Sequence, residues 1–514
     1  MAELRRNLMD SGDRELRAVL EELGHPRVLV MGDMILDHYV WGQAERVSCE
    51  SPALVLRAGC EEVRLGGAAS VASLLRGLEA EVSVAGVIGN DAAGHQLRRL
   101  LQDQGIEQTA LCCDSHRPTT RKQRFLGQVQ EGLAQQLLRI DHEERQEVSK
   151  DLEESLSQHV IRQLGVCDVL LISDYAKGVC TPGLLGKVLS AAKRQHVPVL
   201  VDPAPRANYG RYRAAELLLP NRREAEQALG TSIRTPQDAW IAGWKLCVRY
   251  DLPAMLVKLD RDGMVLVQPA GGSQWLSTVP RRVQDVTGGG DMVLAVAGLC
   301  RAAEVPWEQA AALANVAAGL EVERLGVTPV TRAEIILELW HQERHERGKY
   351  VTQDEMTELA KCYRRTNQRV VFTNGCFDLL HAGHVLCLQE AACRGDVLVV
   401  AVNNDRSVRR LKGEGRPIIP EADRLALVAA LECVTHVLLF DEETPHELLW
   451  RIRPDVLVKG GTYSQEQVVG REVVEEYGGQ VCITKKRADL STTGLLKTLR
   501  NMPVRPMANG LGIG

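Results

Sequence analysis

The sequence predicts an α/β protein built from two domains, and three observations support this prediction. The chain has 514 residues, which at roughly 100–200 residues per domain suggests two to four domains. Apolar residues make up 45% of the chain and charged residues 25%, as in folded globular proteins. Short apolar runs of β type alternate with helical segments along two stretches, and such alternation implies parallel sheets covered on both faces.

The first α/β stretch begins near residue 27 and contains a small sheet of a different kind. Apolar runs followed by helical segments predict buried strands at residues 27–37, 81–89, 168–176, 198–204 and 254–267. Residues 38–64 alternate loosely between apolar and polar side chains, which predicts a small, half-exposed sheet.

A charged helical stretch over residues 331–363, with a break near Gly348, separates the two α/β stretches. The second stretch has predicted strands at residues 369–375, 396–405, 435–442, 455–461 and 480–486. We therefore expect a first domain at residues 1–343, a linker at 344–351 and a second domain at 352–514.

Charge and composition exclude several function classes. Lys and Arg number 62 and Asp and Glu 67, so the net charge of −5 offers no electrostatic attraction for nucleic acid or an anionic membrane. No apolar run approaches the ~18 residues of a membrane span, and the N-terminus lacks a secretory signal. The 14 cysteines form no CxxC pair, and we expect them to be buried free thiols of a cytoplasmic protein. The chain contains no GxxxxGK[ST], which excludes a P-loop enzyme.

The first chemical motif is DVTGGGD, residues 285–291, followed by an apolar helix. Glycines at a helix N-terminus expose backbone N–H groups that can form an anion hole. A carboxylate beside the hole, Asp291, could take a proton from an alcohol during phosphoryl transfer. The alternative is a plain glycine turn in which Asp291 caps the helix.

The motif is similar to the DTxGAGD signature of ribokinase-like carbohydrate kinases, and MGDMILD, LGGAAS, DYAKGV, PNRREAE and ALANVAAG match that family in order over residues 25–335. The resemblance implies a ribokinase-like fold with a small β lid. It also implies that Asp291 is the catalytic base and that the anion hole is formed by Gly288, Gly289 and Gly290. The sugar contacts that it implies are Asp33, Asp37, Gly66, Gly67 and Ser70. Asn221 and Glu224 would contact the Mg-nucleotide, and Asn315 would contact the adenine. Gly289 replaces the usual Ala, and Ser70 replaces the Asn that holds sugar hydroxyls.

The second chemical motif is GCFDLLHAGH, residues 375–384, between a predicted strand and a predicted helix. His381 and His384 are three residues apart and share a face of a helical turn, where imidazoles can stabilise charge on a phosphorus centre. The alternative is a surface or core histidine pair. The segment resembles the signature of cytidylyltransferase-like nucleotidyltransferases, with a Rossmann-like fold. That resemblance implies His381, His384 and Lys459 as catalytic groups, and nucleotide contacts at Asn374, Phe377, Asp378, Lys412, Arg424, Ser491, Thr492 and Thr493.

His341 and His345, four residues apart, could suggest zinc, but no third ligand is evident, so we expect a solvated helix and no metal cluster. Mg²⁺ is expected only with ATP.

The order of the two domains resembles that of the bifunctional enzymes of ADP-heptose synthesis. The resemblance implies ATP-dependent phosphorylation of D-glycero-β-D-manno-heptose 7-phosphate at O1, then AMP transfer from ATP to heptose 1-phosphate, with a separate phosphatase between the steps. It suggests a homodimer through residues 38–64, and we expect Lys177, Arg121 and Arg139 to hold the 7-phosphate. Three alternatives remain: the same chemistry on another sugar phosphate, one inactive domain, or a non-enzymatic sugar-nucleotide sensor.

Overall fold

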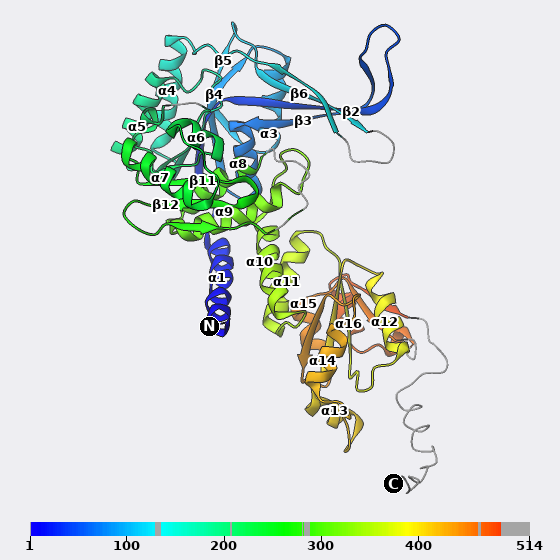
Figure 1. Ribbon diagram of the computed structural model, residues 1–514. Coiled ribbons are helices and arrows are strands. Elements are labelled where there is room, and N and C mark those ends of the chain that lie inside the picture. The colour runs from blue at the N-terminus through cyan, green and yellow to red at the C-terminus, as the bar shows by residue number, and fades with distance from the viewer. Residues whose placement is uncertain are drawn as a thin grey trace, which may run out of the picture. The chain divides into compact units, whose positions relative to one another are not determined.

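The computed structural model describes residues 2–128, 135–205, 208–279, 281, 288–460 and 464–484, and the chain forms two compact units, residues 1–335 and 336–514. Figure 1 shows an α/β arrangement in both, which confirms the predicted fold class. α10 (Arg332–Arg347) runs across residues 335 and 336, and it ends before Gly348, whose φ of +80° accounts for the expected break. The linker at residues 344–351 stays a prediction.

A nine-stranded sheet forms the centre of the first unit, in the order β13-β12-β11-β10-β9-β8-β1-β4-β5. β12 is antiparallel to both neighbours, and the other pairings are parallel. The strands are β1 (Arg27–Gly32), β4 (Glu81–Gly89), β5 (Glu107–Asp114), β8 (Val169–Ser173), β9 (Val199–Asp202), β10 (Leu217–Leu218), β11 (Ala254–Lys258), β12 (Met264–Val267) and β13 (Gln274–Leu276).

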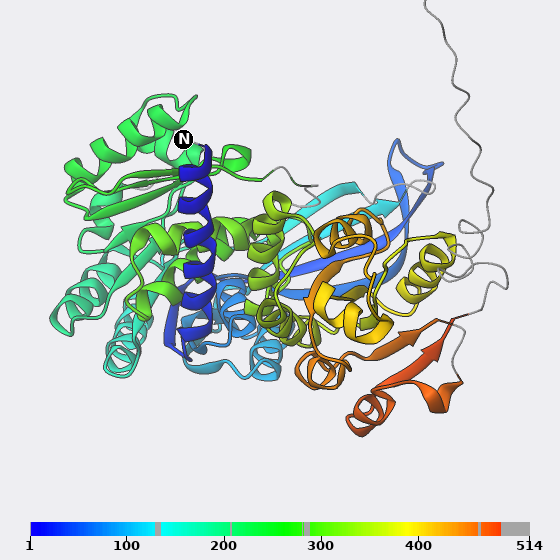
Figure 2. The same cartoon turned by 90° about the horizontal axis from the view of Figure 1, so that it is seen from below.

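Helices lie on both faces of this sheet, as Figure 2 shows, because its strands carry apolar side chains on both sides. α4, α5, α6 and α7 contribute to one core, which includes Leu29 and Ile172. α8 packs on the opposite face, where Gly298 lies against Leu171. The helices of this unit are α1 (Ala2–Glu22), α2 (Ala68–Gly77), α3 (Ala92–Asp103), α4 (Lys150–Leu164), α5 (Pro182–Arg194), η1 (Tyr209–Tyr212), α6 (Arg222–Leu229), α7 (Pro236–Tyr250), η2 (Asp260–Asp262), α8 (Gly289–Ala302) and α9 (Trp307–Glu321).

A second, four-stranded sheet projects from the first unit, and we call it the lid sheet (Figure 1). Its order is β3-β2-β6-β7, with β2 (Met34–Val47), β3 (Leu54–Gly67), β6 (Thr120–Gln128) and β7 (Gln135–His142). β2 and β3 confirm the small sheet predicted at residues 38–64. β6 and β7 were missed, because their many charged side chains hide the apolar–polar alternation that marks a strand.

The second unit contains a five-stranded parallel sheet in the order β16-β15-β14-β17-β18. From β14 the chain adds β15 and β16 on one side and then β17 and β18 on the other. The strand order therefore reverses between β14 and β17, and ligands bind at this point in such sheets. Its elements are α11 (Gln353–Arg365), β14 (Val370–Gly375), α12 (Ala382–Ala392), β15 (Val397–Asn403), α13 (Asp405–Lys412), α14 (Glu421–Ala429), β16 (His436–Phe440), α15 (His446–Ile452), β17 (Val456–Lys459), η3 (Gln465–Gln467), α16 (Arg471–Glu476) and β18 (Gln480–Ile483).

Two further observations concern the whole described chain. None of its described helices combines the length and apolar character that crossing a bilayer requires. The 14 cysteines are free, but the expectation that they are buried is wrong for Cys49, Cys60, Cys113 and Cys393, which are exposed on strands, loops or helix ends.

Two candidate active sites

Asp291 lies in the first turn of α8 and is only 5% exposed. Two hydroxyl groups contact its carboxylate: Ser70 Oγ lies 2.5 Å from Oδ2, and the Tyr175 hydroxyl lies 3.0 Å from Oδ1. Burial raises the pKa of Asp291 to about 6, although the Ser70 hydrogen bond opposes the shift. The carboxylate is therefore mostly ionised at neutral pH and can accept a proton.

The glycine turn before Asp291 has the geometry that an anion hole needs. Gly288 has a φ of +98° and caps α8, so the first N–H groups of this 14-residue helix have no partner within the helix. A Cβ on Gly288 would lie 2.9 Å from Glu321 Oε1, and one on Gly290 would lie 3.2 Å from Lys258 Nζ. Asp285 and Thr287, the first residues of the motif, lie outside the described residues.

Two acidic side chains and a lysine lie beside the glycine turn. Lys258, at the end of β11, forms an ion pair of 2.8 Å with Asp202, at the end of β9. Burial raises the pKa of Glu224 to about 7, and the charge of Asp202 adds to the shift. Asn221 and Glu224 form a capping box at the start of α6, in which Asn221 accepts from the Glu224 backbone N–H and its own N–H donates to Glu224 Oε2. The structure thus brings Asn221, Glu224 and Lys258 into one electrostatic cluster.

The predicted sugar-contacting aspartates both have protein partners. Asp33 accepts hydrogen bonds from the backbone N–H groups of Tyr175, Lys177 and Val179, so it holds the loop after β8. Asp37 forms a buried ion pair of 2.5 Å with Arg124 of the lid sheet.

Gly66 and Gly67 lead from β3 into α2, and Gly67 has a φ of +60° at the start of that helix. The side chain of Ser70, three residues later in the first turn of α2, is fully buried and reaches Asp291. The serine therefore contacts the candidate base, whereas the resemblance gave this position a role in holding sugar hydroxyls.

The remaining residues that we expected in this site are spread more widely. Arg139 pairs with Asp141 at 2.9 Å, and Lys177 pairs with Glu143. Asn315 Nδ2 donates to the Ser277 carbonyl at 2.8 Å.

In the second unit, His381 and His384 stack with ring centroids 3.9 Å apart at the start of α12. His381 Nδ1 accepts a hydrogen bond from the Gly383 N–H, which leaves its Nε2 as the group available to a ligand. Burial, together with the neighbouring His381 and Lys412, lowers the pKa of His384 to about 4. Both rings are neutral hydrogen-bond partners at pH 7 rather than cations.

Lys459 and Asn374 meet at the ends of β17 and β14. Lys459 Nζ donates to Asn374 Oδ1, and burial lowers the lysine pKa to about 8. The two neighbouring strands thus bring together residues that are 85 positions apart. Phe377 packs against His384 with a centroid distance of 5.4 Å, whereas Lys412 is exposed at the end of α13.

Asp378 and Arg424 make structural contacts with backbone groups and with charged side chains around the site. Asp378 accepts from Arg416 and from the backbone N–H groups of Ile418 and Ile419. Arg424 is fully buried, donates to three backbone carbonyls and pairs with Asp405 at 2.7 Å. Ser491, Thr492 and Thr493 lie outside the described residues.

Several side chains of these sites were not singled out from the sequence: Tyr175, Asp202, Lys258 and Glu321. The first three end or follow predicted parallel strands, so a search for polar residues at strand ends would have found them. Glu321 is fully buried at the end of α9, and no sequence signal marks it, because a helix-ending glutamate is ordinarily a surface residue.

Comparison with known proteins gives a family for each unit and for the chain as a whole. Residues 26–333 match the pfkB family of carbohydrate kinases, and residues 372–505 match the cytidylyltransferase-like family. Bifunctional protein HldE of Geotalea uraniireducens is 42% identical over 96% of this chain and 99% of its own length, and that of Geobacter metallireducens is 44% identical over 92% and 95%. The chain belongs to the HldE family.

Members of the HldE family are bifunctional enzymes, and this chain has both of their domains: an ATP-using carbohydrate kinase followed by a nucleotidyltransferase. The kinase fold is also that of phosphofructokinase-2 from Escherichia coli, with a TM-score of 0.53 and 18% identity over 62% of this chain and 99% of that one. The predicted family and enzyme class are therefore confirmed.

Proposed function

We propose that the first unit phosphorylates D-glycero-β-D-manno-heptose 7-phosphate at O1 and that the second unit transfers AMP from ATP to heptose 1-phosphate. Membership of the HldE family over nearly the whole chain is the observation that carries this proposal. The products are ADP-heptose and pyrophosphate. A separate phosphatase removes the 7-phosphate between the two steps, since both domains are accounted for by transferase families.

In the kinase reaction, Asp291 accepts the proton of the attacking sugar hydroxyl. Ser70 and Tyr175 hold its carboxylate in place, and its pKa of about 6 keeps it ionised at neutral pH while still basic enough to accept a proton. The N–H groups of Gly289, Gly290 and Asp291 stabilise the charge on the transferred phosphoryl group.

Mg²⁺ would accompany ATP in this unit, and the residues present fit a hard cation. Asp202 and Glu224 offer carboxylate oxygens, and after burial the charge of Asp202 is the next largest cause of the raised pKa of Glu224. A divalent cation there would neutralise charge on the phosphates.

In the adenylyl transfer, His381 and His384 hold the α-phosphate at the start of α12, and Lys459 neutralises charge that develops on it. The sugar phosphate attacks the α-phosphorus and pyrophosphate leaves, so positioning and electrostatics provide the catalysis. Asn374 orients the Lys459 ammonium.

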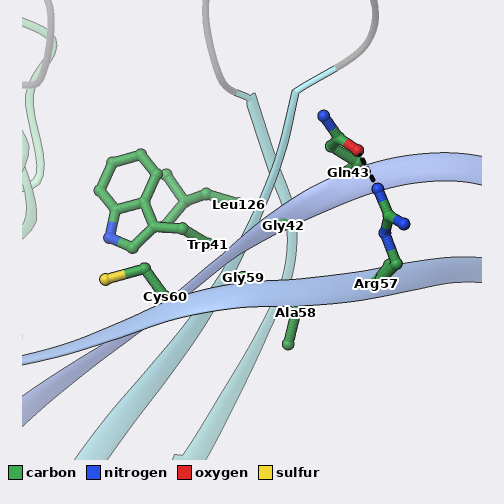
Figure 3. A pocket seen from close by; sticks show the side chains of 8 residues that line it. All are labelled: Trp41, Gly42, Gln43, Arg57, Ala58, Gly59, Cys60 and Leu126. Atoms are coloured by element: carbon green, nitrogen blue, oxygen red, sulfur yellow. Dashed lines mark hydrogen bonds between the residues drawn. The ribbon is translucent and has the colours of Figure 1, made fainter.

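The lid sheet supports a homodimer. Val47, Leu54 and Leu138 of this sheet are each more than half exposed. A hollow of about 460 Å³ opens beside Trp41, Arg57, Cys60 and Leu126 (Figure 3). Exposed apolar side chains beside a concave surface are typical of association sites.

A pair of substitutions in the full-length protein tests the division of labour. Asp291→Asn should abolish sugar phosphorylation and leave adenylyl transfer intact, and His384→Ala should do the reverse. Each reaction is assayed alone, with heptose 7-phosphate or heptose 1-phosphate, alongside hexose and pentose phosphates. Equal damage to both reactions by either substitution in folded protein would contradict the assignment, and turnover of only another sugar phosphate would replace the substrate.

A further inference from the structure

The three cations that the sequence suggested for the sugar phosphate are not the ones best placed to bind it. Arg139 and Lys177 already have carboxylate partners, Asp141 and Glu143. Arg121 is adjacent to Lys122 on β6, and because side chains alternate along a strand, Arg121 points to the opposite face of the lid sheet from Lys122. The neighbouring cation on β6, Lys122, is better placed.

The Lys122 side chain lies beside the candidate base. Its ammonium sits over the ring of Tyr175, 4.8 Å from the centroid, and the Tyr175 hydroxyl is the group that contacts Asp291. Burial lowers the pKa of Lys122, and the charges of Asp37 and Asp291 oppose this shift. Within the described part of the chain, the Lys122 ammonium forms no hydrogen bond or ion pair.

The face of β6 that carries Lys122 also borders a small depression in the first unit. Thr120 lies two residues earlier on the same face, and it lines a narrow polar depression together with Asp33 and Lys177. Arg124 lies two residues later on that face, where Asp37 neutralises it. Asp37 also lies opposite Lys122 in the pairing of β2 with β6, but its ion pair is with Arg124. Among the described residues of this face, Lys122 is therefore the cation without an ion pair.

A partly buried ammonium without a partner is costly, and a bound anion would remove that cost. We propose that Lys122 binds the phosphate group of the acceptor sugar phosphate and so positions the sugar hydroxyl at Asp291. The proposal rests on the proposed kinase function and adds a specificity-determining residue to it. Lys258, which lies beside Gly290 of the glycine turn, differs because Asp202 already pairs with it.

Steady-state kinetics of Lys122→Met in the full-length protein tests this role, because methionine keeps the length of the side chain and removes its charge. We expect KM for the sugar phosphate to rise roughly 10- to 100-fold, the range for loss of one hydrogen bond to a charged group, while KM for ATP stays the same. Lys122→Arg should recover part of the loss. Lys193→Met, at the exposed end of α5, is the matched control and should change nothing.

Two further readouts separate phosphate binding from a structural role. The penalty of Lys122→Met should largely disappear with the same sugar lacking its phosphate. In the wild type, kcat/KM for the sugar phosphate should fall at alkaline pH, with a midpoint below the ordinary lysine pKa of about 10.4. Lys122→Arg should abolish that fall, because a guanidinium stays charged. The charged groups that influence Lys122 are Asp37, Arg124, Asp291 and Arg139.

The outcomes distinguish this proposal from the proposed function. The variants are compared on whichever sugar phosphate the wild type turns over fastest. If that substrate is not heptose 7-phosphate, the proposed substrate is wrong, but the test of Lys122 still holds. Equal penalties with and without the substrate phosphate, a raised KM for ATP, or an unchanged KM for the sugar phosphate would each overturn the role of Lys122. Adenylyl transfer by the same preparations reports that the protein is folded.

Discussion

The substitution Gly288→Ala tests whether the glycine turn forms the anion hole of the kinase. Gly288 has a φ of +98°, and an added Cβ would lie 2.9 Å from Glu321 Oε1 and 3.0 Å from Val327 Cγ2. Glu321 cannot easily move away, because it is fully buried and its Oε1 accepts the Thr328 N–H at 2.9 Å. The turn must therefore shift to accommodate the methyl group.

The expected magnitude follows from two costs. A non-glycine residue in the left-handed region costs about 1–2 kcal/mol. Crowding of a close-packed site adds about 1–3 kcal/mol, so the strain totals about 2–5 kcal/mol. If the turn moves by about 1 Å to relieve it, kcat for sugar phosphorylation should fall on the order of 100-fold.

The assay is sugar phosphorylation by the full-length variant, with adenylyl transfer as an internal measure of folding. Gly186→Ala is the control, because Gly186 lies within α5 with nothing inside 4 Å of an added Cβ, and this change should be neutral or stabilising. Combining Gly288→Ala with Glu321→Ala should recover part of the activity by removing the oxygen that crowds the methyl group. A Gly288→Ala enzyme with wild-type kcat would refute the reasoning.

The remaining predictions concern pH and stability. Because Asp291 must be ionised to act, and burial raises its pKa to about 6, kcat/KM for sugar phosphorylation should fall as pH drops through about 6. Ser70→Ala removes a hydrogen bond that favours the carboxylate, so this acid limb should move to higher pH in a pH–rate profile. Adenylyl transfer should lose no activity to protonation of His384 until pH approaches about 4, so an acid limb near pH 6.5 in the wild-type profile would contradict the assignment. Arg424→Ala leaves buried partners unsatisfied, and thermal or denaturant unfolding should show a loss of about 3–5 kcal/mol in the second unit, whereas a nucleotide-binding role alone would raise KM for ATP without that loss.

Much of the two candidate sites could be predicted from the sequence because the motifs are local. DVTGGGD and GCFDLLHAGH each place a ligand-binding turn, a helix start and the reacting side chain within ten residues. Backbone geometry over so short a span follows from glycine, the strand before the turn and the helix after it. Asp291 and the pair His381 and His384 therefore lie at helix starts, as their motifs indicated.

The partners of these residues could not be read in the same way. Ser70 lies 221 positions from Asp291, and Lys459 lies 85 from Asn374. The packing of α2 on α8 brings the first pair together, and the pairing of β14 with β17 brings the second. Charge in a sequence likewise does not show which cations are already paired: Arg139, Lys177 and Arg424 carry the same charge as Lys122, but each has a carboxylate beside it.

The sequence by itself determined the two α/β domains and their families and indicated the candidate reacting residues, because these depend on periodicity and on short contiguous motifs. Only the tertiary structure decided which charges are free for a ligand, which carboxylates are held at raised pKa and which arginine is buried as a support. Those properties arise from burial and from neighbours distant in the chain, and a linear pattern of residues contains neither.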